Sequence, residues 1–149
     1  MKISAEREKI LIPLQTVIGV VERRQTMPIL ANILLSAKNN RLSVTATDLE
    51  VELLASIDVT VQQGGDITVP GRKFLDICRA LPEGVTISLS VEGDKITVKA
   101  GRSRFTLSSL PAADFPTVEE INAQQTLQIP QADFKRLLGF SLQEPTTKL

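Results

Sequence analysis

One short junction occurs three times in this chain, and this repetition constrains the fold more than any other feature. The copies begin at Ala5, Val69 and Ile129, which gives a period of about 60 residues. Each copy follows a short strand-like run and opens a helical pattern of apolar residues. The strand-like runs are Lys2–Ser4, Asp66–Thr68 and Thr126–Gln128. A repeat with a fixed period predicts a duplicated fold, in which each unit covers the apolar face of its neighbour.

The first two copies continue into sequence that is typical of antiparallel strands. Leu42–Thr47 alternates between apolar and polar residues, and an extended run is expected over Ile29–Ala37. Turn signals separate the strands at Asn39-Asn40 and at Glu92–Asp94. Each complete unit therefore has the predicted element order β-α-β-β-β.

Two such units predict an α+β domain with pseudo-twofold symmetry, in which the helices lie side by side on one face of antiparallel sheets. We expect this domain to span residues 1–121, with repeats of about 1–64 and 65–121. Residues 122–149 then form a linker and the first strand and helix of a truncated second domain. Because the third copy stops at Leu149, the repeat also predicts that the sequence is part of a longer protein.

Composition excludes several classes of function. The 17 Lys and Arg residues balance 17 Asp and Glu residues, so any contact with nucleic acid must come from the arrangement of charge. Histidine is absent and Cys78 is the only cysteine, which argues against a metal site, a cofactor and a nucleophilic enzyme. The charged start of the chain and the lack of a long apolar run favour a cytoplasmic protein without membrane contact.

Several segments resemble, in the same order, the bacterial β sliding clamp family, the β subunit of DNA polymerase III. They cover most of residues 1–140 and become highly specific in combination. The matching segments are Glu22–Leu30, Thr45–Glu50, Val69–Phe74, Gly101–Ser108 and Leu110–Pro116. The sequence is thus similar to the N-terminal part of that family. It departs from the family pattern after the third helix, where Leu142–Leu149 does not match.

The resemblance implies a DNA-clamp domain that takes part in DNA replication as a processivity factor. Members of the family have three such domains, and two subunits form a homodimer ring around double-stranded DNA. The helices line the hole, and the ring tethers the replicative polymerase after a clamp loader has placed it. The family has no catalytic activity of its own. A fragment of this length is not expected to close a ring alone.

The resemblance also implies residues that contact DNA. It assigns Arg24 to a loop contact and Arg72 to a contact at the start of the second helix. Such contacts go to phosphates, which position the duplex without reading its sequence. Arg23 lies beside Arg24 on the same loop, and further basic residues are expected on the helices. They are Arg7, Arg79 and Arg136.

A second surface is implied at the subunit interface. Arg102–Leu107 alternates, and it is expected to be an edge strand that pairs with the next subunit. The resemblance assigns the interface to the apolar residues Ile77, Phe105 and Leu107. Its cationic residues are Lys73, Arg102 and Arg104.

Two alternatives remain open from the sequence. A stand-alone interaction domain that self-associates through exposed strand edges, without DNA function, fits the same strand pattern. A carboxylate-dependent hydrolase would use Asp48 and Glu50, which are expected to share one face of a strand with Glu52. A solvated strand face explains these acids more simply.

Overall fold

The computed structural model describes residues 1–21, 26–117 and 124–141, which fall into two compact units. The first unit is Met1–Val118 and the second is Glu119–Leu149. Two α-helices of the first unit are α1 (Arg7–Val17) and α2 (Gly71–Ala80). Its strands are β1 (Lys2–Glu6), β2 (Asn32–Lys38), β3 (Arg41–Thr47), β4 (Glu52–Asp58), β5 (Thr60–Gln63), β6 (Gly65–Pro70), β7 (Thr86–Glu92), β8 (Lys95–Ala100) and β9 (Ser103–Ser108).

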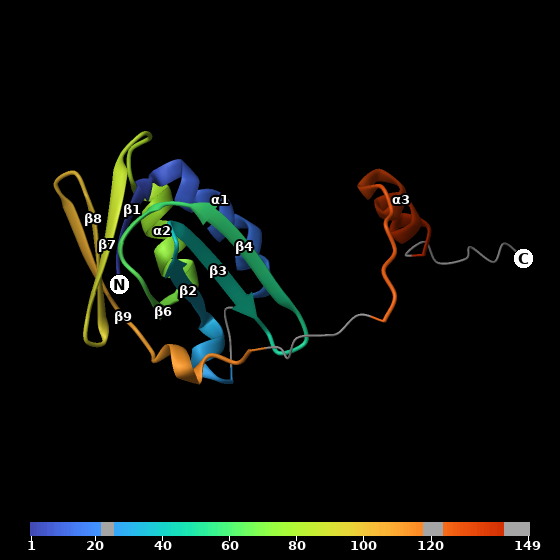
Figure 1. Ribbon diagram of the computed structural model, residues 1–149, viewed down its shortest axis with the longest axis horizontal. Helices are drawn as coiled ribbons and strands as arrows, with labels where there is room; N and C mark the ends of the chain where they lie inside the picture. Colours follow the sequence, from blue (N-terminus) through green and yellow to red (C-terminus); the bar gives the residue numbers. More distant parts are fainter. Residues whose placement is uncertain (22–25, 118–123, 142–149) are drawn as a thin grey trace, which may run out of the picture. The chain divides into compact units, whose positions relative to one another are not determined.

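The strands form two antiparallel sheets, and the repeats exchange their first strands between them (Figure 1). One sheet has the order β4-β3-β2-β6, and the other has the order β5-β1-β7-β8-β9. Strand β1 therefore pairs with β7 of the second repeat, while β6 pairs with β2 of the first. This exchange confirms the predicted duplicated α+β architecture with pseudo-twofold symmetry. Strand β5 is an addition of the first repeat, and it pairs with the free side of β1.

Tight turns form where the sequence indicates them. Asn39 and Asn40 both have positive φ angles, of 51° and 56°, between β2 and β3. Two successive residues with positive φ are the signature of a two-residue hairpin, and Asn tolerates this conformation better than most residues. Gly93, with φ of 60°, makes the corresponding turn between β7 and β8. These hairpins fix the register of the strands and hence which side chains reach the core.

One hydrophobic core lies among the two sheets and the two helices. Helices α1 and α2 pack against each other, and α1 also contacts β3 and β4. The fully buried residues come from every layer, for example Ile10 on α1, Phe74 on α2, Leu35 on β2 and Leu89 on β7. Because both repeats contribute to this core, neither repeat buries its apolar face alone.

Three segments differ from the sequence-based expectation. The run Ile29–Ala37 is extended only from Asn32, because Pro28 begins a 3₁₀ turn at Pro28–Ala31. The turn directs Ile29 and Leu30 into a small cluster with Phe115. Asp48 and Glu50 lie in the turn between β3 and β4, so they do not share a strand face with Glu52. Thr126–Gln128 is irregular and exposed in place of the expected strand, and the described residues give it no neighbouring strand.

The second unit contains one described helix, α3 (Gln131–Ser141). Phe134, Leu137 and Leu138 lie at helical spacing on it and are all exposed. None of the described helices is long and apolar enough to span a membrane.

Candidate functional site

The adjacent helices α1 and α2 carry four of the basic residues that the sequence singles out, which are Arg7, Arg72, Lys73 and Arg79. Lys9 on α1 and both Lys73 and Arg79 on α2 are exposed. Acidic residues are interspersed, since Asp76 is exposed on α2 and Glu6 lies 4.0 Å from the Lys9 ammonium. The helix surface thus offers a few separated cations, which suits phosphate contacts better than a specific anion pocket.

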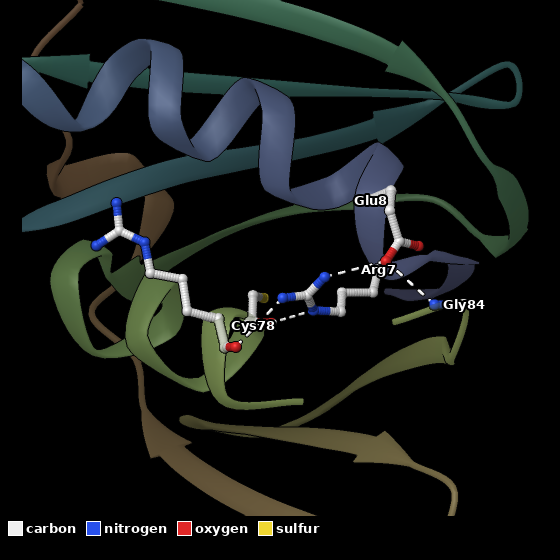
Figure 2. Close-up of polar contacts among 5 residues, drawn as sticks. Arg7, Glu8, Cys78 and Gly84 are labelled. Carbon is white, nitrogen blue, oxygen red and sulfur yellow. Dashed lines mark hydrogen bonds and ion pairs between the residues drawn. The ribbon is translucent and has the colours of Figure 1, made fainter. Parts of the chain in front are cut away.

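Arg7 does not belong to this exposed set, because its guanidinium joins the two helices (Figure 2). Its Nε donates to the Cys78 carbonyl oxygen at 2.7 Å, and Nη2 donates to the Arg79 carbonyl oxygen at 3.2 Å. Its Nη1 donates to Glu8 Oε1 at 3.0 Å. The side chain is only 13% exposed. The first residue of α1 therefore caps the C-terminal end of α2, where unpaired carbonyls attract a cation.

Glu8 extends this junction to the loop after α2. Its Oε1 also accepts from the Gly84 backbone N–H at 3.1 Å (Figure 2). Three hydrogen bonds hold the pKa of Glu8 below its ordinary value of 4.5. The bond from Gly84 has the largest effect, followed by those from the backbone N–H of Glu8 and from the Arg7 side chain. The ionised carboxylate is thus the form that the folded protein favours.

A pH dependence follows from this lowered pKa. A depressed folded-state pKa contributes stability above the unfolded value, and this contribution disappears as pH falls through the folded value. We expect the wild-type protein to lose more thermal stability than Glu8→Gln as pH falls from about 5 to about 3. Melting curves followed by circular dichroism at several pH values measure this difference. Glu83→Gln is the matched control, because Glu83 is exposed and has no described hydrogen bond. Parallel pH curves for Glu8→Gln and wild type would contradict the assignment.

Arg72 makes the reciprocal connection in the other direction. It lies in the first turn of α2, and its Nη2 donates to the carbonyl oxygen of Val21, which follows the 3₁₀ turn at the end of α1. Its Nε is buried and lacks a partner among the described residues. Arg7 and Arg72 thus tie the start of each helix to the end of the other. Only part of the Arg72 guanidinium remains for an external anion.

The remaining expected DNA contacts lie elsewhere. Arg23 and Arg24 fall outside the described residues. Arg136 lies on α3 in the second unit, where its Nη2 is 3.5 Å from Asp133 Oδ1. Of the six expected residues, the structure brings Arg7, Arg72 and Arg79 together on the helix pair. Among these three, Arg79 is exposed, whereas Arg7 and Arg72 are partly buried.

The residues expected at a subunit interface lie on α2 and around β9. Strand β9 is the outermost strand of its sheet, so one side of its backbone has no neighbouring strand among the described residues. Arg102 lies in the turn before β9, and Arg104 lies on the strand; both are exposed. Phe105 is half-buried, whereas Leu107 is only 8% exposed and belongs to the core. Of these two side chains, Phe105 is the more accessible to a partner.

The expected α2 residues of that surface differ in exposure. Lys73 is exposed, and Ile77 is half-buried against the core. Lys99, which no sequence motif singles out, is exposed on β8 and lies directly opposite Arg104. The turn at Gly101, read with strand alternation, could have revealed this pair.

The residues considered for catalysis have structural surroundings. Asp48 Oδ1 accepts from the backbone N–H groups of Val51 and Glu50, at 2.7 and 2.9 Å. These bonds lower the pKa of Asp48, and the bond from Val51 has the larger effect. The ionised carboxylate therefore stabilises the turn between β3 and β4. Burial raises the pKa of the Cys78 thiol to about 12, which keeps this thiol protonated.

Comparison with known proteins gives a consistent result. Residues 1–119 match the family described as DNA polymerase III beta subunit, N-terminal domain. The chain is 52% identical over 139 residues to the beta sliding clamp of Pseudomonas aeruginosa. The aligned residues cover 93% of this chain and 38% of that protein. It is 49% identical over 139 residues to the beta sliding clamp of Escherichia coli K12, with the same coverage of 93% and 38%.

Solved structures agree with these relatives. The DNA polymerase III subunit beta from P. aeruginosa has a TM-score of 0.88 and 50% identity, covering 93% of this chain and 38% of that one. Caulobacter crescentus pol III beta has a TM-score of 0.78 and 47% identity, covering 80% of this chain and 33% of that one. The chain thus spans about 38% of the length of the curated relatives it matches. The predicted resemblance and the predicted fold class are both confirmed.

Proposed function

Because this chain belongs to the DNA polymerase III beta subunit family, over its N-terminal domain, we propose that it supplies the first domain of a sliding clamp. In this proposal the complete protein is a non-catalytic replication factor that forms a homodimer ring around duplex DNA. The ring tethers the replicative polymerase, after a clamp loader has opened and closed it. The relatives named above are bacterial, so the protein would act on DNA in the cytoplasm.

The proposed contact with DNA rests on the pair of helices α1 and α2. They pack against each other and expose Lys9, Lys73 and Arg79. Separated cations on a rigid helix layer contact phosphates and do not read bases. Binding that ignores sequence allows a ring to slide. Arg24 and Arg72 complete the proposed contacts, whereas Arg7 acts by joining the helices.

The proposed interface part rests on the open edge at β9. Its proposed surface consists of the cations Lys73, Arg102 and Arg104 and of the half-buried residues Ile77 and Phe105. A partner strand would extend the sheet through backbone hydrogen bonds, while acids on the partner would meet the cations. We retain Leu107 as a residue that supports this edge from the core.

Binding of the 149-residue chain to a short duplex tests the DNA-facing surface. We expect weak, sequence-independent binding whose log affinity falls linearly with log salt, because each phosphate contact releases counterions. Replacing both Lys73 and Arg79 by Ala should reduce the magnitude of the slope by about 1.8, at about 0.9 per lost contact. Fluorescence anisotropy at several salt concentrations measures this slope.

The matched control replaces two exposed strand lysines, Lys38 and Lys95, by Ala. Their loss should leave the salt slope unchanged, because neither lies on the helix layer. An equal loss of slope in this control, or submicromolar binding at physiological salt, would contradict the proposal. For a full-length clamp carrying this domain, retention on closed circular DNA should end when the circle is cut.

A further inference from the structure

Four strands end the two sheets, and three of them carry residues that oppose pairing with a further strand. The ends are β5 and β9 in one sheet and β4 and β6 in the other. Strand β4 carries Glu52, β9 carries Arg104, and β6 ends at Pro70. Charged residues and proline are common means of keeping another strand from an open edge. Strand β5 has neither, since its sequence is Thr-Val-Gln-Gln.

The composition of β5 favours pairing with another extended chain. The run Val59–Gln63 contains no charge, no proline and no glycine, and its Val and Thr residues favour extended structure. Thr60, Gln62 and Gln63 are exposed. An edge of this composition would accept a further strand if its backbone groups were free. The protection of this edge must therefore come from another part of the fold.

The turn between β2 and β3, which belongs to the other sheet, supplies acceptors to this edge. The carbonyl oxygen of Asn40 accepts from the Val59 N–H at 2.9 Å, and Asn40 Oδ1 accepts from the Val61 N–H at 3.2 Å. These two N–H groups are two residues apart, so they face the same edge of the strand. A neighbouring strand would present its carbonyl oxygens to the same groups. Asn40 therefore replaces two carbonyls of a strand that is not there.

Two further features hold the turn beside β5. Asn40 has a φ angle of 56°, which asparagine tolerates better than most residues. Gly64 directly follows β5, and a Cβ atom added to it would lie 2.8 Å from the Ala37 carbonyl oxygen on β2. The backbone at the end of β5 thus lies directly against the hairpin that carries Asn40.

We propose that Asn40 is an internal strand mimic that keeps the β5 edge closed to other chains. The chain that it excludes is the β5 edge of a second copy, because two uncharged strands can meet without charge repulsion. Backbone hydrogen bonds between two such strands would join the sheets of two molecules. This protection acts within the first unit, and it depends neither on DNA nor on the proposed clamp function.

Asn40→Gly in the 149-residue chain tests the proposal. Glycine keeps the positive φ angle and the carbonyl bond to Val59, but it removes the acceptor of the Val61 N–H. Hydrogen exchange should show lost protection of the Val61 amide and retained protection of the Val59 amide. The opened edge should also make self-association faster than in wild type, as measured by light scattering and thioflavin T fluorescence. The increase should persist at high salt, because no charges drive this pairing.

Two variants separate this effect from a general loosening of the turn. Asn39→Gly is the matched control, because Asn39 has a φ angle of 51° in the same turn and its exposed side chain has no hydrogen bond among the described residues. It should associate like wild type. Asn40→Gly with Gln62→Lys should also return to the wild-type rate, because a charged edge opposes pairing with its own copy. Circular dichroism melting curves establish that each variant is folded.

Three outcomes would overturn the proposal. The first is wild-type association of folded Asn40→Gly, and the second is equally fast association of Asn39→Gly. The third is association of Asn40→Gly that Gln62→Lys does not suppress, since it would place the contact away from β5.

Discussion

Phe74→Ala is expected to lower the free energy of unfolding of the first unit by about 3–5 kcal/mol. Phe74 is fully buried on α2, in the core that both sheets and both helices share. Its removal loses the transfer free energy of the ring and leaves a cavity that a close-packed interior fills only in part. Since a domain of this kind is stable by about 5–15 kcal/mol, this one change removes a large part of the total. Urea denaturation followed by circular dichroism measures the loss.

The repeat supplies a matched control for this substitution. Phe134 occupies the corresponding position of the third copy, but it is 51% exposed on α3. Phe134→Ala should therefore change the unfolding of the first unit by less than about 0.5 kcal/mol. Equal losses for the two variants would show that the core described around α2 does not determine the stability of this unit.

Arg7→Ala is expected to destabilise the first unit by about 2–4 kcal/mol, because hydrogen bonds from charged groups are lost and helix carbonyls remain unpaired. The carbonyl oxygens of Cys78 and Arg79 accept from Arg7, and Glu8 loses its ion pair. Arg7→Lys should recover only part of the loss, since an ammonium cannot reproduce the fork of guanidinium donors. Chemical denaturation measures the three free energies of unfolding.

Arg79→Ala serves as the control, because the Arg79 side chain is exposed and only its backbone takes part in the junction. We expect little change in stability for this variant but a smaller salt slope in DNA binding. Arg7→Ala, measured where it remains folded, should show the reverse pattern. A stable Arg7→Ala protein with a reduced salt slope would return Arg7 to the set of DNA contacts.

Local features of this fold could be predicted from the sequence because their causes are local. Asn39-Asn40 and Gly93 can adopt positive φ angles, and the hairpins form there. The helical stripe around Phe74 predicts a buried helix face without knowledge of its partners. The family motifs made more of the fold predictable than these local features alone, and the comparisons confirm the resemblance. The assignments of individual DNA and interface residues stay predictions.

Other features depended on partners that are distant in the sequence. The exchange of β1 and β6 between the sheets follows from packing around the shared core, and no residue in either strand specifies it. Arg7 resembles any exposed arginine until α2 ends beside it, 71 positions later in the chain. Lys99 becomes significant only when the register places it opposite Arg104. Strand propensity alone could not exclude the 3₁₀ turn at Pro28–Ala31, because that turn is stabilised partly by contact with Phe115.

The exchange of strands also determines when this domain can fold during its synthesis. Ile3 pairs with Leu89, so the first strand leaves the ribosome long before its β7 partner exists. At about 5–20 residues per second, the ribosome needs roughly 4–17 seconds to make the 86 residues from Ser4 to Leu89. Over that interval β1 lacks its β7 partner, and an open strand with apolar residues is a site for aggregation. Completion of the second repeat therefore ends the period in which β1 is unpaired on its β7 side.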